Sequence, residues 1–488
     1  MAEKKRNLKP FFIMLAFVVL IGILLLPTPE GLSLMGHRTL AVLAFAIILW
    51  MTEAVSYPVS SAMIVAILTI LLGLSPSLDN PDALLTTEGA LKMVLSGFAS
   101  PAVALVAGAL FLAAAMQATN LHKRLALYIL SKVGPKPGAI VFGTIIVSII
   151  LAFFVPSATA RAGAIVPILL GMIAAFKLPV NSRLGALLII TAVQSISIWN
   201  VGIKTAAAQN MVALDFISKE FKVSVAWGEW FMYAAPWAVL MSVVLYFVML
   251  KVIKPETTNL TSGITVVNDS LKELGPLHKS EIRLIIISVL LLFFWSTESI
   301  VHPFDSTTVT LVAVAILLTP KIGVFTWEQV EKLIPWGTII VFAVGITLGT
   351  VLLSTNSAQW LSSKVFGLMG LDSMPLLATI ALLSLFNIII HLGFASATSL
   401  ASALIPIVLA LATTLQSDVN PVGFVLIQQF VISFGFLLPV SAPQNMLAYG
   451  TGAFSVKDFV KTGVPLTIIG YLLILLFSAT YWQWIGLL

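Results

Sequence analysis

The chain has 488 residues, of which 59% are hydrophobic and 9% are charged, and it contains no cysteine. Because soluble proteins carry about 25% charged residues, this composition excludes an ordinary soluble globular protein and indicates a polytopic helical membrane protein. The net charge of +6 comes mostly from Lys and Arg in short loops and does not indicate nucleic-acid binding, and the lack of cysteine excludes disulfides and thiolate chemistry.

Eleven apolar runs predict membrane spans. They lie near residues 11–26, 39–50, 59–74, 93–117, 184–198, 230–253, 282–297, 306–318, 335–353, 422–438 and 464–485. Two further segments, near residues 138–176 and 374–415, are predicted as hairpins that enter the membrane and return to the same side. The segments around 121–133 and 357–367 are amphipathic and are expected at the membrane surface, and the polar stretch 254–281 joins two halves of the chain.

The distribution of positive charge predicts the orientation in the membrane. Met1–Pro10 is basic and is followed by an apolar run without a small-residue cleavage signal, which favours an uncleaved first span over a signal peptide. A cytoplasmic N-terminus puts nineteen of the 26 Lys and Arg residues on the cytoplasmic side and five outside, and it leaves Arg161 and Lys204 within the membrane. The positive-inside rule therefore predicts a cytoplasmic N-terminus and an extracellular C-terminus, with the first hairpin opening from the cytoplasm.

The two hairpins carry the same motif at the point where each is expected to turn. The motif reads Ser157-Ala158-Thr159 in the first hairpin and Ser396-Ala397-Thr398 in the second, 239 positions later. Each apolar arm is expected to be too short to cross the bilayer and return as two full spans, since a span needs about 20 apolar residues. Backbone that breaks helix at this depth is tolerated only where it is buried in protein or lines a cavity. A pair of such breaks in the two halves of a chain indicates the binding site of a transporter.

Three more motifs repeat, and together they predict an inverted repeat. The pairs are Trp50-Met51-Thr52-Glu53 with Trp295-Ser296-Thr297-Glu298, Thr119-Asn120 with Thr355-Asn356, and Gln209-Asn210-Met211 with Gln444-Asn445-Met446. An odd number of spans separates the two copies, so the copies have opposite orientations in the membrane. The predicted fold is an all-α polytopic membrane protein of about eleven spans and two re-entrant hairpins, with its binding site where the halves meet.

The polar residues of these motifs predict an anion site. Hydroxyls of Ser157, Thr159, Ser396 and Thr398 lie where a helix begins, and free backbone N–H groups and the helix dipole favour negative charge there. Two such tips facing each other suit a ligand with two separated negative groups. The helix breaks at Ala206–Asn210 and Ser441–Asn445 supply the remaining candidates, which are Gln209, Asn210, Pro443, Gln444 and Asn445. The side-chain amides of the two glutamines and two asparagines either bind the ligand or bridge broken backbone, and both roles remain open.

Three ionisable residues lie deep in the membrane. Arg161 follows the first tip, His391 precedes the second tip, and Lys204 precedes the first break. Because no Asp or Glu falls within the hairpins or breaks, an anionic substrate is the expected partner of Arg161. The alternatives are that Arg161 caps backbone carbonyls and that His391 is a neutral side chain held by backbone. Lys204, Thr205 and Ser441 are expected to support the site from a second layer, and neither a metal nor a cofactor is expected.

These motifs resemble those of the divalent anion–sodium symporter family, the INDY-like carriers of citrate and dicarboxylates. That family has hairpin tips that read Ser-Asn-Thr and helix breaks close to Thr-Pro-Pro-Asn. The resemblance covers essentially the whole chain. It implies a homodimer in which a scaffold, here residues 1–136 and 282–370, holds the partner. A transport domain, here residues 137–253 and 371–488, slides through the membrane as an elevator, and residues 254–281 are a cytoplasmic linker. By the family pattern, the four tip hydroxyls contact substrate carboxylates.

The chain departs from the family pattern where sodium-coupled members hold their ions. The tip asparagines are replaced by Ala158 and Ala397, which weakens oxygen-rich cation sites, and Arg161 and His391 place positive charge nearby. The chain thus resembles the exchanger branch, which includes bacterial citrate/succinate, tartrate/succinate and α-ketoglutarate/succinate antiporters and plastid dicarboxylate translocators. The expected function is sodium-independent exchange of C4 and C5 dicarboxylates such as succinate, α-ketoglutarate, malate and fumarate, with citrate and tartrate as further candidates.

Other functions are less well supported by the residues. Sodium-coupled symport of the same substrates is the main alternative. A proton-coupled antiporter should bury a carboxylate in the helix breaks, and none occurs there. An intramembrane enzyme needs a nucleophile and base or metal ligands at depth, and three of the five histidines fall in loops. The expected partners are dicarboxylate anions, membrane lipid and a second copy of the chain, with no nucleic acid, in a bacterial cell membrane.

Overall fold

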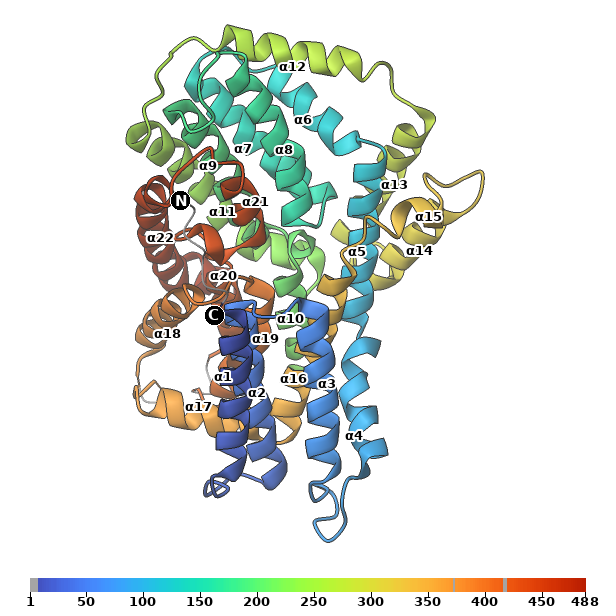
Figure 1. Cartoon of the computed structure of the whole chain (residues 1–488), viewed down its shortest axis with the longest axis vertical. Helices are drawn as coiled ribbons and strands as arrows, with labels where there is room; N and C mark the ends of the chain where they lie inside the picture. Colours follow the sequence, from blue (N-terminus) through green and yellow to red (C-terminus); the bar gives the residue numbers. More distant parts are fainter. Residues whose placement is uncertain (1–7, 372–373, 416–418) are drawn as a thin grey trace.

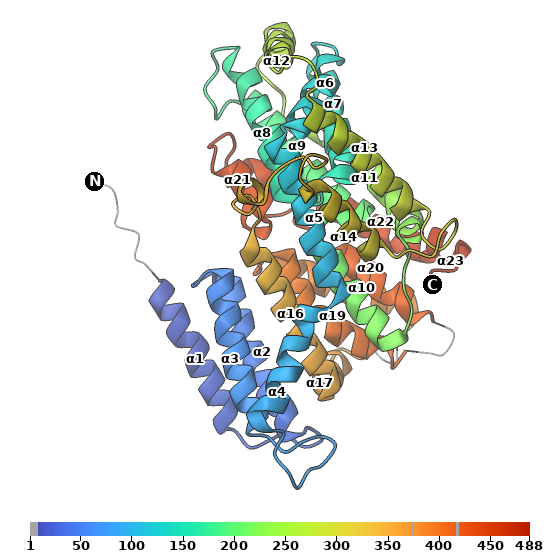
Figure 2. The same cartoon turned by 90° about the vertical axis from the view of Figure 1, so that its right-hand side faces the viewer.

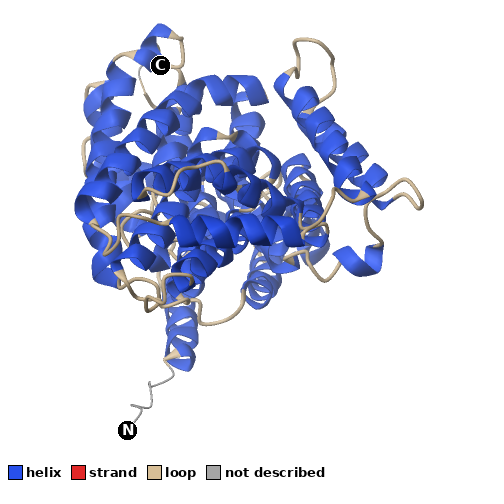
Figure 3. Ribbon diagram, turned by 90° about the horizontal axis from the view of Figure 1, so that it is seen from above, coloured by secondary structure: helices blue, strands red, loops and turns tan. Residues whose placement is uncertain are grey.

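The computed structural model describes residues 8–371, 374–415 and 419–488, and these residues form helices joined by loops, with no strand (Figure 3). The basic residues Lys4, Lys5 and Arg6, which contribute to the predicted orientation, lie outside the described residues. The helices of the first half are α1 (Lys9–Leu25), α2 (Leu34–Thr52), α3 (Tyr57–Gly73), α4 (Thr86–Leu95), α5 (Pro101–Ala118), α6 (Leu121–Ser131), α7 (Pro137–Phe154), α8 (Ala158–Ala174), α9 (Arg183–Gly202), α10 (Ala208–Phe221) and α11 (Trp227–Val252).

The linker forms a helix of its own, and the second half follows the same order as the first. The linker helix is α12 (Thr261–Glu273). The second half contains α13 (Lys279–Ser296), α14 (Ser306–Leu318), α15 (Trp327–Val330), α16 (Trp336–Ser354), α17 (Ser357–Gly367), α18 (Leu376–His391), α19 (Ala397–Ala412), α20 (Pro421–Ile432), α21 (Pro443–Tyr449), α22 (Val456–Ala479) and α23 (Tyr481–Trp484). Short 3-10 turns are η1 (Ser96–Ala99), η2 (Lys204–Ala206) and η3 (Pro439–Ser441).

Each of the eleven predicted spans overlaps a helix, but one of them is interrupted and another, 422–438, is helical only as far as Ile432. The predicted run 93–117 breaks between α4 and α5, because Pro101 cannot donate a backbone hydrogen bond and Ser100 instead caps α5 by accepting the Ala102 N–H at 3.1 Å. Within the described residues, seven helices are long and apolar enough to cross a membrane by length and composition. One of these is α7, the first arm of the first hairpin. The other hairpin arms, α8, α18 and α19, are shorter.

The repeated elements have opposite orientations. The amphipathic helices α6 and α17 both begin after an asparagine in the left-handed conformation, Asn120 with φ 57° and Asn356 with φ 56°. Helix α6 lies in the upper part of the molecule and α17 in its lower part (Figures 1 and 2). Asparagine adopts this conformation more readily than other residues with a Cβ atom. The inverted repeat predicted from the sequence is therefore present in the fold.

The apolar core has two parts, and α16 lies between them. One cluster joins α1–α4 with α16, and the larger cluster contains most of the other helices. The helices α3 and α19 pack against α16, which also contacts α10. Helix α9 is the most enclosed span, because every residue from Leu184 to Gly202 is buried. The polar side chains of α9 must therefore find partners inside the protein.

The linker is tied to the start of α9. The Glu256 carboxylate accepts hydrogen bonds from the backbone N–H groups of Arg183 at 2.7 Å and Leu184 at 3.0 Å. Partial burial raises the pKa of Glu256, but these N–H donors and the nearby Arg183 charge outweigh burial and hold the pKa below its ordinary value. A carboxylate at a helix N-terminus also interacts favourably with the helix dipole.

Close packing against α22 positions the non-helical segment that follows α20. A Cβ atom on Gly463 would lie inside contact distance of the Phe436 carbonyl oxygen and close to the backbone of Leu437. The same Phe436 carbonyl accepts a hydrogen bond from Gln194 Nε2 at 3.0 Å, so the segment is held from two sides.

We expect Gly463→Ala to lower the free energy of unfolding by ~1–3 kcal/mol, the usual cost of overpacking a well-packed interior. Gly22→Ala on α1 is the matched control, because a Cβ atom there meets nothing within 4 Å. Thermal unfolding of the purified protein in detergent measures both variants. Equal unfolding temperatures for the two variants would contradict the packing described here.

Candidate substrate-binding site

The two hairpin tips have nearly the same backbone conformation. Ser157 has φ −141° and ψ 113°, and Ser396 has φ −138° and ψ 117°. Each serine hydroxyl accepts the backbone N–H three residues later, from Ala160 and Ser399, at 3.3 Å. These caps leave other first-turn N–H groups of α8 and α19 without a helical partner. Both predicted tips thus present hydroxyls and a helix N-terminus at one point.

The two helix breaks also match, and an asparagine bridges each one. Asn210 Nδ2 lies 2.8 Å from the carbonyl oxygen of Asn200, 3.2 Å from that of Ile203 and 3.3 Å from that of Lys204. Asn445 Nδ2 donates to the carbonyl oxygen of Gly435 at 2.8 Å. Each asparagine thus bonds a carbonyl ten residues earlier, freed where α9 and α20 end. The sequence left open whether these asparagines bind the ligand or bridge broken backbone. Their contacts are those of a backbone bridge.

The two glutamines beside these asparagines make different contacts. Gln209 Nε2 donates to Ser433 Oγ at 3.4 Å, and Gln444 Nε2 donates to Ser197 Oγ at 3.1 Å. Each bond joins one half of the chain to the other. The glutamines therefore lie where the halves meet. Each asparagine bridges its own break, and Asn210 Oδ1 also accepts a hydrogen bond from Gln429 Nε2 of the second half at 3.3 Å.

A cavity of about 910 Å³ lies between the tips, the breaks, α5 and the start of α16. Among the predicted site residues, the cavity is lined by Ser157, Ala158, Thr159, Thr205, Gln209, His391, Ser396, Ala397, Thr398, Ser441, Pro443 and Gln444. The described residues that line it include no Asp, Glu, Lys or Arg. The cavity extends to Asn120 and His122 on the α6 side, next to a smaller space of about 310 Å³ beneath α12.

Arg161 lies behind the cavity wall. Its side chain is fully buried, and Nη2 donates to Asn200 Oδ1 at 2.5 Å and to the Ala206 carbonyl oxygen at 3.0 Å. Atoms Nε and Nη1 have no partner among the described residues. Arg161 thus makes the carbonyl-capping contact that was the alternative reading of the sequence. A single side chain, that of Asn200, separates the Arg161 guanidinium from the cavity, because Asn200 bonds Arg161 and lines the cavity.

His391 lies at the cavity wall, beside the second break. Its Nε2 atom is 3.1 Å from the carbonyl oxygen of Ser441, and Nδ1 has no partner among the described residues. Because a carbonyl only accepts, Nε2 carries a proton in this arrangement. The unpartnered Nδ1 is then an acceptor when the ring is neutral and a second donor when the ring is charged.

Three other predicted residues do not line the cavity. Asn210 and Asn445 lie behind it, as their bridging contacts require, and Lys204 points away from it toward the carbonyl oxygen of Val225 at 2.7 Å. Lys204 also lies near the carboxylate of Glu298. The expectation that no protein carboxylate is available therefore fails for Lys204, since Glu298 is remote in sequence from the hairpins and breaks.

Several polar residues of the cavity were not predicted. Besides Asn120 and His122, they are Tyr57, Gln117, Asn200, Ser433 and Thr338. Asn200 could have been found from the sequence, because it is a polar residue near the end of an otherwise apolar span and lies ten positions before Asn210. The others carry no repeated pattern, and only the packing of α3, α5, α16 and the end of α20 brings them to the cavity.

A sequence profile described as the sodium:sulfate symporter transmembrane region matches residues 5–488. The chain belongs to this family, the divalent anion–sodium symporters. A membrane protein of Cupriavidus necator is 48% identical over 471 residues, covering 96% of this chain and 92% of the relative. The citrate/succinate antiporter of Escherichia coli is 28% identical over 95% of this chain and 96% of its own. The sodium-dependent dicarboxylate transporter SdcS of Staphylococcus saprophyticus is 24% identical over 93% and 87%.

The fold is also similar to a solved transporter structure. The antimetabolite efflux pump MtrF of Neisseria gonorrhoeae aligns with a TM-score of 0.54 at 14% identity, covering 96% of this chain and 97% of that chain. At this identity the similarity concerns the fold alone. Together with the apolar helices, the family membership identifies the chain as an integral membrane transporter of the divalent anion–sodium symporter family.

The tip hydroxyls generate one prediction about affinity. We expect Thr159→Val and Thr398→Val to weaken succinate binding by roughly 1.5–3 kcal/mol each, because each removes a hydrogen bond to a charged group. Ser157→Ala and Ser396→Ala should weaken binding as well and should also lower thermal stability, because these hydroxyls cap α8 and α19. Isothermal titration and thermal unfolding separate the two effects. Unchanged affinity in all four variants would rule out a site at the tips.

The amides of the breaks generate a second prediction. Asn210→Ala should lower the unfolding temperature, because three buried carbonyl groups lose a donor. Gln209→Ala should keep more of the stability and mainly change ligand affinity, because its side chain lines the cavity and makes one long hydrogen bond. The same two measurements on both variants are decisive. If Gln209→Ala is the less stable of the pair, the assigned roles are reversed.

Proposed function

We propose that the protein is a sodium-independent antiporter that exchanges C4 and C5 dicarboxylates across the membrane. The observation that carries this proposal is the environment of Arg161. The guanidinium is fully buried, its two partners are the neutral Asn200 side chain and the Ala206 carbonyl, and no carboxylate lines the adjacent cavity. A buried fixed charge without a counter-ion is unfavourable. An anionic substrate supplies that counter-ion.

The doubled tips support a substrate with two carboxylates. Each tip offers hydroxyls and a helix N-terminus, and the two tips line one cavity from different halves of the chain. Helix N-termini favour anions. Succinate, α-ketoglutarate, malate and fumarate carry two separated carboxylates, and citrate and tartrate are further candidates. The names of the Escherichia coli and Staphylococcus relatives support the same substrate class.

The fixed charge also supports exchange over uptake alone. Arg161 remains charged in a protein, so an empty carrier takes at least one positive charge through the membrane. Moving an uncompensated charge through the bilayer centre costs at least ~2.5–3.5 kcal/mol, which slows the return of the empty carrier about 100-fold if the cost appears in the transition state. A bound dicarboxylate cancels the charge. The loaded carrier then crosses while the empty carrier stalls.

We further propose an elevator mechanism in a homodimer. Residues 137–253 and 371–488, which contain both hairpins and both breaks, form the transport domain. Residues 1–136 and 282–370 form the scaffold that holds the partner, and residues 254–281 are a cytoplasmic linker. The smaller apolar cluster, which joins α1–α4 with α16, supports a scaffold that packs apart from most of the transport helices. The proposed orientation has a cytoplasmic N-terminus and an extracellular C-terminus in a bacterial cell membrane.

Sodium-coupled transport of the same substrates is the second candidate, and one observation favours it. Ser399 Oγ and Asn445 Oδ1, both on elements of the second half, are buried and have no partner among the described residues. Hydroxyl and amide oxygens can coordinate a hard cation. The relative SdcS is named as sodium-dependent. The alanines at both tips weigh against this candidate, because they remove the amide oxygens that the family pattern supplies.

Exchange in liposomes tests the proposal directly. We expect rapid uptake of labelled succinate into liposomes loaded with succinate or α-ketoglutarate. Uptake into empty liposomes should be slower by a factor of about 100 or more. Replacing sodium by potassium or choline on both sides should leave the rate unchanged. Fast uptake without internal dicarboxylate, or a steep rise with sodium, would overturn exchange in favour of the second candidate.

The Arg161 charge gives a separate prediction. We expect Arg161→Gln to reduce exchange by weakening anion binding, because it removes the buried positive charge behind Asn200. Lys92→Gln is the matched control, since Lys92 is exposed and pairs with Glu88 on α4 at 2.8 Å. Succinate affinity and exchange rate are measured in both variants. Wild-type affinity in Arg161→Gln would contradict the role given to this charge.

A further inference from the structure

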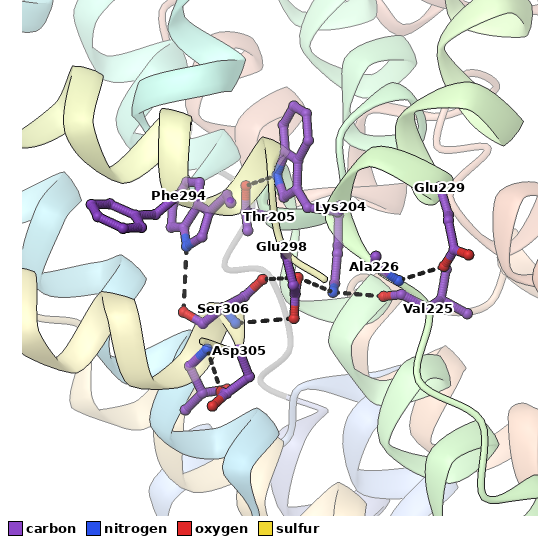
Figure 4. A network of polar contacts seen from close by, with 12 residues as sticks. Lys204, Thr205, Val225, Ala226, Glu229, Phe294, Glu298, Asp305 and Ser306 are labelled. Carbon is purple, nitrogen blue, oxygen red and sulfur yellow. Dashed lines mark hydrogen bonds and ion pairs between the residues drawn. The ribbon is translucent and has the colours of Figure 1, made fainter. Parts of the chain in front are cut away.

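A second buried cation, Lys204, is paired across the protein. Lys204 Nζ lies 3.8 Å from Glu298 Oε2, and the two side chains are 7% and 9% exposed. Lys204 is in the break between α9 and α10, whereas Glu298 follows α13 (Figure 4). Lys204 Nζ also donates to the Val225 carbonyl oxygen at 2.7 Å.

The Glu298 carboxylate is held firmly in this position. Ser306 donates its backbone N–H to Oε1 at 3.2 Å and its hydroxyl to Oε2 at 2.6 Å. Ser306 is the first residue of α14, so Glu298 also caps that helix. Both oxygens of Glu298 therefore have partners within its own α13–α14 turn, and the contact with Lys204 adds a link to a different part of the molecule.

Two other carboxylates lie near this pair and have other roles. Glu229 accepts the Ala226 N–H at 2.7 Å at the start of α11, and Asp305 accepts the N–H groups of Thr307 and Thr308 at the start of α14 (Figure 4). Among the described residues, Glu298 is the one carboxylate within 4 Å of Lys204. The ion pair is thus specific to these two residues.

We propose that the Lys204–Glu298 ion pair is a lock that holds the transport domain against the scaffold in the state seen here, and that it separates on every transport cycle. The inference rests on the proposed elevator, because the two residues belong to the two proposed domains. In this state the cavity reaches the α6 side, and neither Lys204 nor Glu298 lines it. Helix α13, about 27 Å long, separates Glu298 from the α12 end of the molecule. The lock therefore closes the side opposite α6.

The inverted repeat indicates that the lock acts in one state. Glu298 corresponds to Glu53, which accepts a hydrogen bond from the Tyr57 hydroxyl at 3.0 Å. Lys204 begins the turn η2, and the equivalent first residue of η3 is Pro439, which carries no charge. When the transport domain moves to the opposite state, the repeat brings no cation to Glu53. The state open toward α6 thus has an ion pair that its counterpart lacks.

Separation of the lock also changes the charge that crosses the membrane. Once Lys204 leaves Glu298, the moving domain carries the charges of both Lys204 and Arg161. A dianion cancels two positive charges, whereas a monoanion leaves one uncompensated. Lys204 is therefore a second determinant, besides Arg161, of the preference for dicarboxylates. It acts through the net charge of the moving domain and does not contact the ligand.

Thiol labelling measures the two states. The chain has no cysteine, and Gly163→Cys on α8 places a reporter on the cavity wall where an added Cβ atom meets nothing within 4 Å. In lipid nanodiscs we expect rapid labelling by a polar maleimide in this parent protein. Glu298→Gln and Lys204→Met, each in the Gly163→Cys parent, should lower the ratio of accessible to protected carriers by about tenfold or more, because each breaks a buried ion pair.

The controls distinguish the lock from other effects. Glu229→Gln makes the same chemical change beside Lys204 without touching the pair and should leave labelling unchanged. Lys204→Met with Glu298→Gln should equal Lys204→Met alone, because the pair is already broken; this double variant leaves no unpaired charge and keeps the test valid if a single variant fails to fold. Succinate exchange by the unsubstituted chain, which has no cysteine, tests the proposed function separately. If this chain exchanges succinate and labelling is unchanged in the lock variants, or shifts equally in Glu229→Gln, the lock is overturned. Absence of exchange by the unsubstituted chain would instead overturn the proposed function.

Discussion

The structure depends on satisfying backbone groups that two broken helices leave unpaired inside a membrane. No water is available in the hydrocarbon core to bond these groups, so side chains must do so. Asn210 and Asn445 bond the carbonyls freed where α9 and α20 end, and Arg161 bonds the Ala206 carbonyl. Ser157 and Ser396 do the same for N–H groups at the tips. Because these partners fix the non-helical backbone, the remaining hydroxyls and N–H groups at the cavity are available to a ligand.

The inverted repeat supplies a symmetrical framework on which the charges are placed unequally. The tips and breaks match in backbone conformation, yet Arg161 corresponds to Leu400, His391 to Ala152 and Lys204 to Pro439. A symmetrical pair of helix N-termini suits a ligand with two similar ends. In the proposed exchange cycle, unequal charges give the two states of the carrier different energies, since each buried charge then meets different neighbours in each state. The symmetrical framework thus affects which ligand fits the site. The unequal charges affect when the proposed carrier moves.

The sequence predicted which helices are present more accurately than it predicted where each helix begins and ends. Each predicted apolar run overlaps a helix, and both hairpins and both breaks are present, because hydrophobic length and repeated polar motifs are local signals. The run at 93–117 is broken by the turn before Pro101, and the linker contains an additional helix, α12. The roles of Asn210 and Gln209 could not be separated from the sequence, since adjacent amides differ only in where their side chains point.

The sequence by itself determined the membrane class, the inverted repeat, the family resemblance and the residues at the tips and breaks that line the cavity. These properties follow from composition and from motifs that recur at constant spacing, and neither requires knowledge of distant contacts. Tertiary structure alone decided that Arg161 lies behind Asn200 and that Lys204 meets Glu298, ninety-four positions away. The physical reason is that a buried charge is governed by the few groups within about 4 Å of it, and helix packing, which brings remote segments together, selects those groups.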